Sequence, residues 1–99
     1  MTIEVHYLTW NGIDIELTYE PRKWDVTAHL EVRSVKPDLA PLPITETGFL
    51  SHYHPIGTVE SNEGTLVEQV KAWLNEQARS KVWKDYVERS RQGNLFDLL

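Results

Sequence analysis

The stretch IEVHYLTWNGIDIELTYE, residues 3–20, decides the fold because it predicts a β-hairpin. Apolar and polar side chains alternate on both sides of Asn11 and Gly12. An Asn-Gly pair between two alternating runs is the strongest short-range signal for a tight turn between antiparallel strands. The first two strands of the protein are therefore expected here.

Two registers are compatible with this hairpin, and they differ in which side chains share a face. A two-residue loop pairs Trp10 with Ile13 and puts Glu4 on the apolar face of the second strand. A three-residue loop, with Gly12 in the left-handed conformation, pairs Thr9 with Ile13 instead. That register gathers the apolar side chains on one face: Ile3, Val5, Tyr7, Ile13, Ile15, Leu17 and Tyr19. The other face is then polar: Thr2, Glu4, His6, Asp14, Glu16, Thr18 and Glu20. Because a one-residue slip exchanges the two faces, burial should select the clean separation, and we predict the three-residue loop.

Two further strands are expected after the hairpin. Residues 28–35 alternate again and predict a third strand, which follows a loop through residues 21–24. Residues 48–54 predict a fourth strand, which is reached through a proline-containing connection and stopped by Pro55.

The last third of the chain predicts helices. Thr65 and Glu68 have the spacing of a capping box, in which each side chain bonds a free backbone donor of the first turn. One apolar stripe follows at helical spacing: Leu66, Val70, Trp73, Leu74 and Ala78. Residues 80–92 either continue this helix or form a second one capped by Ser80, and Gly93 with Asn94 is expected to end it.

These elements predict one α+β domain over residues 1–99, an antiparallel meander of about four strands in the order β-β-β-β-α-α. One or two C-terminal helices should pack on the apolar face of the sheet, and the polar face should meet solvent. Residues 92–99 are a possible docking tail.

Composition limits the classes of function. The 99 residues are 40% apolar and 25% charged, which is typical of a globular domain. The chain has no cysteine, so disulfides, thiol nucleophiles and cysteine-ligated zinc are excluded, and a cytoplasmic location is expected. Neither a membrane span nor a signal-peptide pattern is present in the sequence, and no cofactor is expected.

The charge is unevenly distributed. Residues 1–70 carry a net charge of −7 and residues 71–99 a net charge of +2. The acids of the predicted polar sheet face are Glu4, Asp14, Glu16, Glu20 and Glu31. We expect this face to bind a basic protein partner, and we do not expect direct binding of nucleic acid, which requires clustered Lys and Arg.

His52 and His54 are the residues with the strongest case for a metal site. They alternate on the predicted fourth strand, so both imidazoles should share one face. A catalytic zinc ion usually takes three protein ligands, and the third would have to be His6 or His29 together with a carboxylate. No family-specific ligand spacing is present, so no metal is assigned, and a metal-dependent enzyme remains an alternative reading. No other catalytic constellation is evident, and we expect that the protein is not an enzyme.

The C-terminal sequence RQGNLFDLL contains apolar residues beyond a Gly-Asn pair. These residues either dock on the core of the protein itself or form a linear motif. Gln92, Leu95 and Phe96 resemble the Gln-x-x-Leu-Phe pattern of bacterial sliding-clamp-binding peptides. That resemblance implies an adaptor that binds a replication clamp through its tail.

A wider resemblance covers most of the chain. The stretch APLPITETGFLSHYHPIGTVE, with AHLEVRSV before it and KAWLNEQARSKVWKDY after it, resembles small uncharacterised bacterial proteins associated with plasmids, prophages and other mobile elements. The resemblance implies a stoichiometric inhibitor of host machinery, as anti-CRISPR and antirestriction proteins are. We therefore expect a small acidic protein-binding module whose partner is a nucleic-acid-processing complex of the host, with the clamp adaptor and the metal-dependent enzyme as alternatives.

Overall fold

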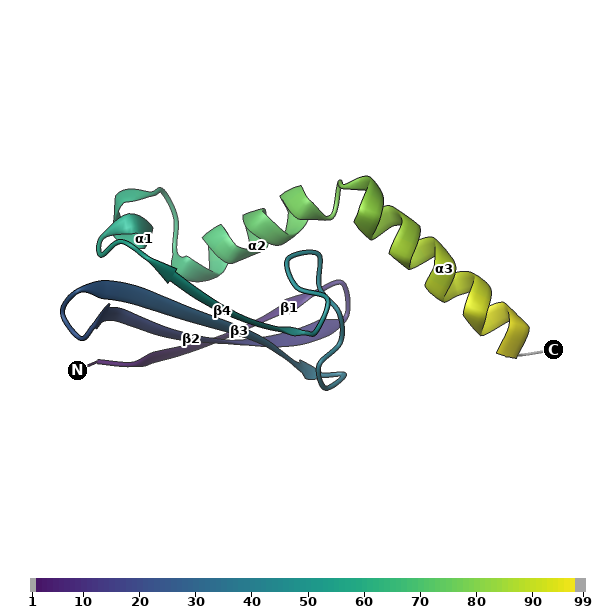
Figure 1. Cartoon of the computed structure of the whole chain (residues 1–99), viewed down its shortest axis with the longest axis horizontal. Helices are drawn as coiled ribbons and strands as arrows, with labels where there is room; N and C mark the ends of the chain where they lie inside the picture. Colours follow the sequence, from purple (N-terminus) through teal and green to yellow (C-terminus); the bar gives the residue numbers. More distant parts are fainter. Residues whose placement is uncertain (1, 98–99) are drawn as a thin grey trace.

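The computed structural model describes residues 2–97, with side chains described for residues 2–90. Within these residues the chain forms four strands followed by three helices. The strands are β1 (Glu4–Trp10), β2 (Ile13–Lys23), β3 (Thr27–Lys36) and β4 (Phe49–His54), and the helices are α1 (Thr58–Ser61), α2 (Leu66–Gln77) and α3 (Lys81–Asp97). The strands form one antiparallel sheet in the order β1-β2-β3-β4 (Figure 1). The predicted α+β meander with C-terminal helices is therefore confirmed.

The helices lie on one side of the sheet and then leave it. Figure 1 shows α2 lying across one face, which we call the inner face, while α3 leads away from the sheet. The opposite sheet face, which we call the outer face, carries no helix within residues 2–97. The molecule is accordingly elongated, with extents of 55 × 23 × 19 Å.

The register of the first hairpin differs from the prediction. Trp10 pairs with Ile13, so the loop has two residues and not three. Asn11 and Gly12 both have positive φ, of 48° and 78°. Positive φ at both central residues is the requirement of a type I′ turn, whose twist matches that of the flanking strands and which Asn-Gly fits best. The local preference of the turn therefore agrees with the two-residue loop.

This register reverses the faces predicted for β1. Leu8 and Trp10 point to the inner face and are buried, whereas Val5 and Tyr7 are on the outer face, with exposures of 49% and 66%. The physical reason is that Trp10 reaches the helices. Its indole nitrogen donates a hydrogen bond of 2.8 Å to Asn75 Oδ1 on α2, and its ring lies 6.0 Å from that of Trp83.

The core lies between the inner face and α2. As the alternation predicted, Ala28, Leu30 and Val32 of β3 are buried in it. The apolar stripe of α2 supplies Leu66, Val70 and Leu74, all of them buried. Strand β2 contributes the fully buried Ile15 and Leu17, and the loop after β3 adds Leu42.

The ends of the helices follow local rules. Thr65 Oγ1 accepts a hydrogen bond from the Glu68 backbone, and the Glu68 side chain accepts one from the Thr65 backbone, so the predicted capping box is present. Ser80 Oγ accepts a hydrogen bond of 3.2 Å from the Trp83 backbone, so a second helix starts there. The predicted end at Gly93 and Asn94 is wrong, because the backbone of α3 remains helical to Asp97.

Strand β2 and its turn also differ from expectation. The strand continues through Pro21 to Lys23, with a register irregularity between Glu20 and Lys23. A proline is tolerated in a strand at such an irregularity, where a ladder hydrogen bond is already missing. The predicted loop at residues 21–24 is therefore largely strand, and the chain turns at Trp24 and Asp25, both with positive φ.

The register can be tested with two substitutions in β1. Leu8→Ala should lower the free energy of unfolding by about 2–5 kcal/mol, because it removes a buried side chain and leaves a cavity. Val5→Thr keeps a β-branched side chain on the outer face and should change the free energy of unfolding by less than about 1 kcal/mol. Chemical denaturation of both variants measures the difference. A larger loss for Val5→Thr would show that the three-residue loop is the correct register.

Candidate functional site

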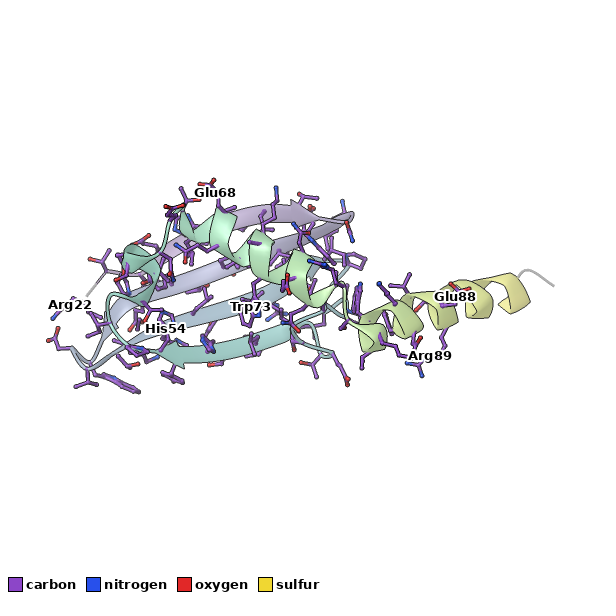
Figure 2. The ribbon with its side chains drawn as sticks, turned by 90° about the horizontal axis from the view of Figure 1, so that it is seen from above. Arg22, His54, Glu68, Trp73, Glu88 and Arg89 are labelled. Carbon is purple, nitrogen blue, oxygen red and sulfur yellow. The ribbon has the colours of Figure 1, made fainter. Side chains whose placement is uncertain are left out.

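A pocket of about 190 Å³ lies between β4 and the helices α1 and α2. Its walls combine apolar side chains with five that can form hydrogen bonds. The lining residues are Leu30, His52, His54, Thr58, Val59, Leu66, Gln69, Val70 and Trp73. Figure 2, which looks down on α2 and the sheet, locates His54 near the end of β4 and Trp73 on α2.

Three elements bring these side chains together. His52 and His54 pair with the inward-facing Leu30 and Ala28 of β3, so both imidazoles are on the inner face, as predicted. After Pro55, Gly57 takes a φ of 89° and turns the chain into α1. Gln69 Nε2 donates hydrogen bonds of 2.8 Å to Val59 O and 3.1 Å to Gly64 O, which fix α1 and its following loop against α2.

His54 is the polar group most enclosed by this arrangement. Its ring stacks on that of Tyr19, with centroids 6.1 Å apart and planes within 5°, and lies 5.4 Å from the ring of His52. Both ring nitrogens are buried, and neither has a hydrogen-bond partner among the described residues. Burial lowers the pKa of His54, and repulsion from His52 lowers it further, while the charge of Glu60 opposes both effects. At neutral pH the ring is therefore uncharged and offers one N–H donor and one nitrogen acceptor.

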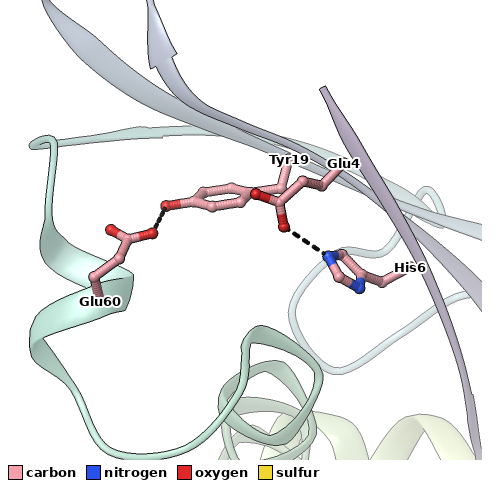
Figure 3. A network of polar contacts seen from close by, with 4 residues as sticks. All are labelled: Glu4, His6, Tyr19 and Glu60. Atoms are coloured by element: carbon pink, nitrogen blue, oxygen red, sulfur yellow. Dashed lines mark hydrogen bonds and ion pairs between the residues drawn. The ribbon is translucent and has the colours of Figure 1, made fainter. Parts of the chain in front are cut away.

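A short polar network borders the pocket beyond Tyr19 (Figure 3). The Tyr19 hydroxyl donates a hydrogen bond of 2.8 Å to Glu60 on α1, and Glu4 Oε1 lies 3.1 Å from His6 Nε2. Burial raises the pKa of Tyr19, and the hydrogen bond to Glu60 raises it further, so the phenol stays protonated. The bond joins residues 41 positions apart and fixes α1 over the end of the sheet.

The acidic face differs from the prediction at one residue. Glu4 lies on the inner face beside His6, because the two-residue loop exchanges the faces of β1. The other acids, Asp14, Glu16, Glu20 and Glu31, alternate with the buried residues of β2 and β3 and share the outer face. Two of these four pair across strands with bases, Asp14 with Lys36 and Glu16 with Arg33.

Exposed apolar side chains accompany these acids on the outer face. Two of them, Val5 and Tyr7, are on the face opposite to the one predicted, because the loop has two residues. Val5 and Tyr7 come from β1, and Phe49 and Tyr53 come from β4, with exposures between 40% and 66%. Tyr53 stacks on His29, with ring centroids 4.3 Å apart. The outer face is therefore a mixed acidic and aromatic surface.

The geometry weakens the case for a metal at the histidine pair. His29 is on the outer face, where its Nε2 lies 2.7 Å from Ser51 Oγ, so it cannot join His52 and His54. His6 is on the inner face but contacts Glu4. Among the described residues, no group of three or more His, Cys, Asp or Glu side chains is placed to hold a metal ion.

The tail residues lie in the last turns of α3. The backbone of Gln92, Leu95 and Phe96 is helical, but their side chains lie outside the part of the chain for which side chains are described. Residues 98 and 99 lie outside the described residues altogether. Among residues 2–97, no helix combines the length and the apolar composition that crossing a membrane requires.

Sequence reasoning missed the helical half of the pocket. Helix α1 has only four residues and no cap from a side chain, so its sequence carries no periodic signal. Thr58, Gln69 and Trp73 were not recognised as neighbours of the histidines. Pro55 and Gly57 together mark a turn and could have indicated that the chain folds back there.

Comparison with known families identifies the family of this chain. A family model described as the KlcB third domain matches residues 3–83. The chain belongs to the KlcB third domain family. The match spans the whole sheet, α1 and α2, and ends at Trp83, whose ring packs beside Trp10 of β1. Most of α3 lies beyond the residues that the family model matches. No curated protein and no solved structure matches the chain.

The burial of His54 predicts a pH effect on stability. The unfolded chain takes up a proton on this residue near pH 6.5, whereas the folded domain does so only at lower pH. Above about pH 6.5 the residue contributes no pH dependence, and below that value the free energy of unfolding should fall as the pH falls. Unfolding curves at about pH 7.5 and 5.5 should show a smaller loss for His54→Phe than for the natural sequence. An NMR titration in which His54 protonates at or above pH 6.5 would contradict this account.

Proposed function

We propose that the protein acts by binding another protein through the outer face of its sheet, and that it carries out no reaction of its own. The observation that supports this most is the exposure of Val5, Tyr7, Phe49 and Tyr53 on a sheet face that no helix covers within the described residues. These side chains form two exposed apolar groups, one on each edge strand, with the polar side chains of β2 and β3 between them. Exposed aromatic side chains of this kind contribute much of the binding energy at protein-interaction sites.

The negative charges on this face indicate the surface charge expected of a partner. Glu16, Glu20 and Glu31 lie between the two exposed apolar groups. Glu16 lies beside Tyr7 and opposite Arg33, whereas no described residue forms a salt bridge with Glu20 or Glu31. Carboxylates without a partner in the free protein can pair with Lys or Arg of another protein and speed its association. A partner with a basic surface, such as one that also binds nucleic acid, complements this face.

In its most specific form the proposal is an inhibitor that occupies such a basic surface. The resemblance to proteins of mobile elements supports an anti-CRISPR-like role, in which the outer face binds a nucleic-acid-processing complex of the host. The family description supports the proposal that this unit acts as a binding module, because a third domain of KlcB is one domain among others.

Charge reversal on the outer face tests the proposal. The triple variant Glu16→Lys, Glu20→Lys and Glu31→Lys should lose the partner when the full chain is crosslinked and purified from its native host. The matched control Glu46→Lys, Asp85→Lys and Glu88→Lys changes the net charge equally at exposed positions away from this face and should retain the partner. Mass spectrometry with quantified yields compares the two, and circular dichroism checks that both variants fold. Equal recovery of the partner by the two variants would remove the outer face as the binding surface.

A second candidate function is clamp binding through the tail. The observation in its favour is the direction of α3, which leads away from the sheet and carries Gln92, Leu95 and Phe96 with it (Figure 1). A motif that is held clear of its own domain remains accessible to a partner. The resemblance of these three residues to clamp-binding peptides gives the partner its identity in this proposal.

Removal of residues 92–99 tests this candidate. The truncated chain should lose capture by a purified bacterial sliding clamp, because the Leu-Phe pair would fill the hydrophobic pocket of the clamp. It should keep its thermal stability, because the family's domain ends at residue 83. If the full chain is not captured by the clamp, or if the truncation does not change capture, the clamp proposal fails.

A further inference from the structure

The free edge of β4 and the pocket beside it form a second surface, distinct from the outer face. Strand β4 is at the edge of the sheet and pairs only with β3. An edge strand presents backbone donors and acceptors that another extended chain can pair with. The question is which of these groups are free and which occupant they fit.

The hydrogen bonds at the two ends of β4 identify the outward-facing residues. Ser34 N donates to Gly48 O at 2.8 Å, and Thr27 Oγ1 donates to His54 O at 3.0 Å, so the backbone groups of residues 48 and 54 point toward β3. Along a strand of an antiparallel pair, the backbone N–H and C=O groups of successive residues point alternately toward and away from the neighbouring strand. The backbone groups of Phe49, Ser51 and Tyr53 therefore point away from β3.

Only part of this edge is already satisfied. Phe49 O accepts hydrogen bonds from Thr45 Oγ1 at 2.7 Å and from Thr47 Oγ1 at 3.1 Å. Within the described residues no hydrogen bond engages the outward backbone groups of Ser51 or Tyr53. Two N–H donors and two carbonyl acceptors are therefore free, which is the set that an added antiparallel strand takes up.

An added strand would direct one side chain toward the pocket. Residues opposite Ser51 and Tyr53 share the outer face, and the residue between them, opposite His52, points to the inner face. Strands are spaced about 4.8 Å apart, so this side chain starts one strand width outside the pocket that His52 and His54 line. Only a long side chain can reach into it.

The shape and chemistry of the pocket select tyrosine. A cavity of about 150 Å³ holds a benzene ring, so a pocket of about 190 Å³ has room for a phenol. Leu66, Val70 and Trp73 supply apolar walls for the ring. Both ring nitrogens of His54 are covered and lack partners among the described residues, so a small rotation of the His54 ring would let one of them accept a hydrogen bond from the phenol hydroxyl.

The surroundings of the pocket are acidic. Gln69 and Trp73 also border a shallow depression on α2 that contains Glu63, Glu68 and Glu76. Basic residues two positions from the tyrosine share the inner face with it and would complement these carboxylates. We propose that β4 binds an extended, basic peptide segment of a partner protein as a fifth antiparallel strand, with a tyrosine side chain anchored between β4 and α2.

Selection of peptides without prior bias tests the occupant. The full chain is immobilised and challenged with a phage-displayed library of random heptapeptides. Tyrosine should be enriched at the centre of the selected peptides, with Lys or Arg two positions away from it. An enriched peptide added to the isotope-labelled chain should shift the amide signals of Ser51 and Tyr53 and the indole signal of Trp73. No enrichment of tyrosine, or shifts confined to other surfaces, would overturn the proposal.

Changes in the selected peptide separate its two modes of contact. Replacement of its tyrosine by alanine should weaken binding by about tenfold or more, as expected for a buried anchor. N-methylation of the peptide amides that face Ser51 and Tyr53 should weaken binding comparably, because it removes the backbone pairing. If N-methylation has no effect, the peptide is not bound as a strand and the proposal fails.

A double-mutant cycle tests the contact with His54. Replacing the peptide tyrosine by phenylalanine should weaken binding about threefold to tenfold in the natural protein and should have little effect in His54→Phe. Tyr7→Ser, on the outer face of β1, is the control that should leave peptide binding unchanged. Because Tyr7 belongs to the outer face, the same variant also distinguishes peptide binding at β4 from partner binding by the outer face. Additivity in the cycle would overturn the role of His54, and concentration-dependent dimerisation through Ser51 and Tyr53 would identify a second copy as the occupant instead.

Discussion

The structure depends first on the turn at Asn11 and Gly12. Positive φ at both residues makes a two-residue loop, and this loop pairs Trp10 with Ile13. Because side chains alternate along a strand, that single pairing determines the face of every residue in β1. It directs Trp10 toward Asn75 and Trp83, and so connects the first strand with the last two helices. The same pairing leaves Tyr7 on the outer face, where it is available to a partner.

The elements were predictable because their signals are local. The alternation of β2 and β3 and the capping box at Thr65 each lie within a few neighbouring residues, and all three are present in the structure. The predicted register of β1 was wrong, because both faces of this strand carry large apolar side chains. Burial alone could not choose between Tyr7 and Trp10. The turn favours the register that buries Trp10, and the hydrogen bond from Trp10 to Asn75, 65 residues further along the chain, stabilises it. Greater weight on the turn preference of Asn-Gly would have given the correct register.

The candidate site was predictable only on its strand side. Alternation placed His52 and His54 on one face of β4, and the structure confirms it. The rest of the pocket comes from contacts between distant segments, such as the hydrogen bond from Tyr19 to Glu60 and that from Gln69 to Val59. No spacing in the sequence encodes such contacts. The acidic face was predicted at four of its five positions, and the error at Glu4 follows directly from the register of β1.

The surfaces proposed for binding arise from a mismatch in width between the two layers. A helix with its side chains is about 10–12 Å wide, whereas the outer strands of a four-stranded sheet lie about 15 Å apart. Among the strands, α2 has its closest backbone contacts with β1, and it reaches β4 through the side chain of Trp73, whose ring lies 5.7 Å from that of His52. The inner face of β4 consequently carries histidines and a pocket in place of a continuous apolar core. The outer face has no covering layer in the described structure, so its aromatic side chains contribute little to the stability of the free domain. Burial against a partner is the state in which those side chains would contribute fully.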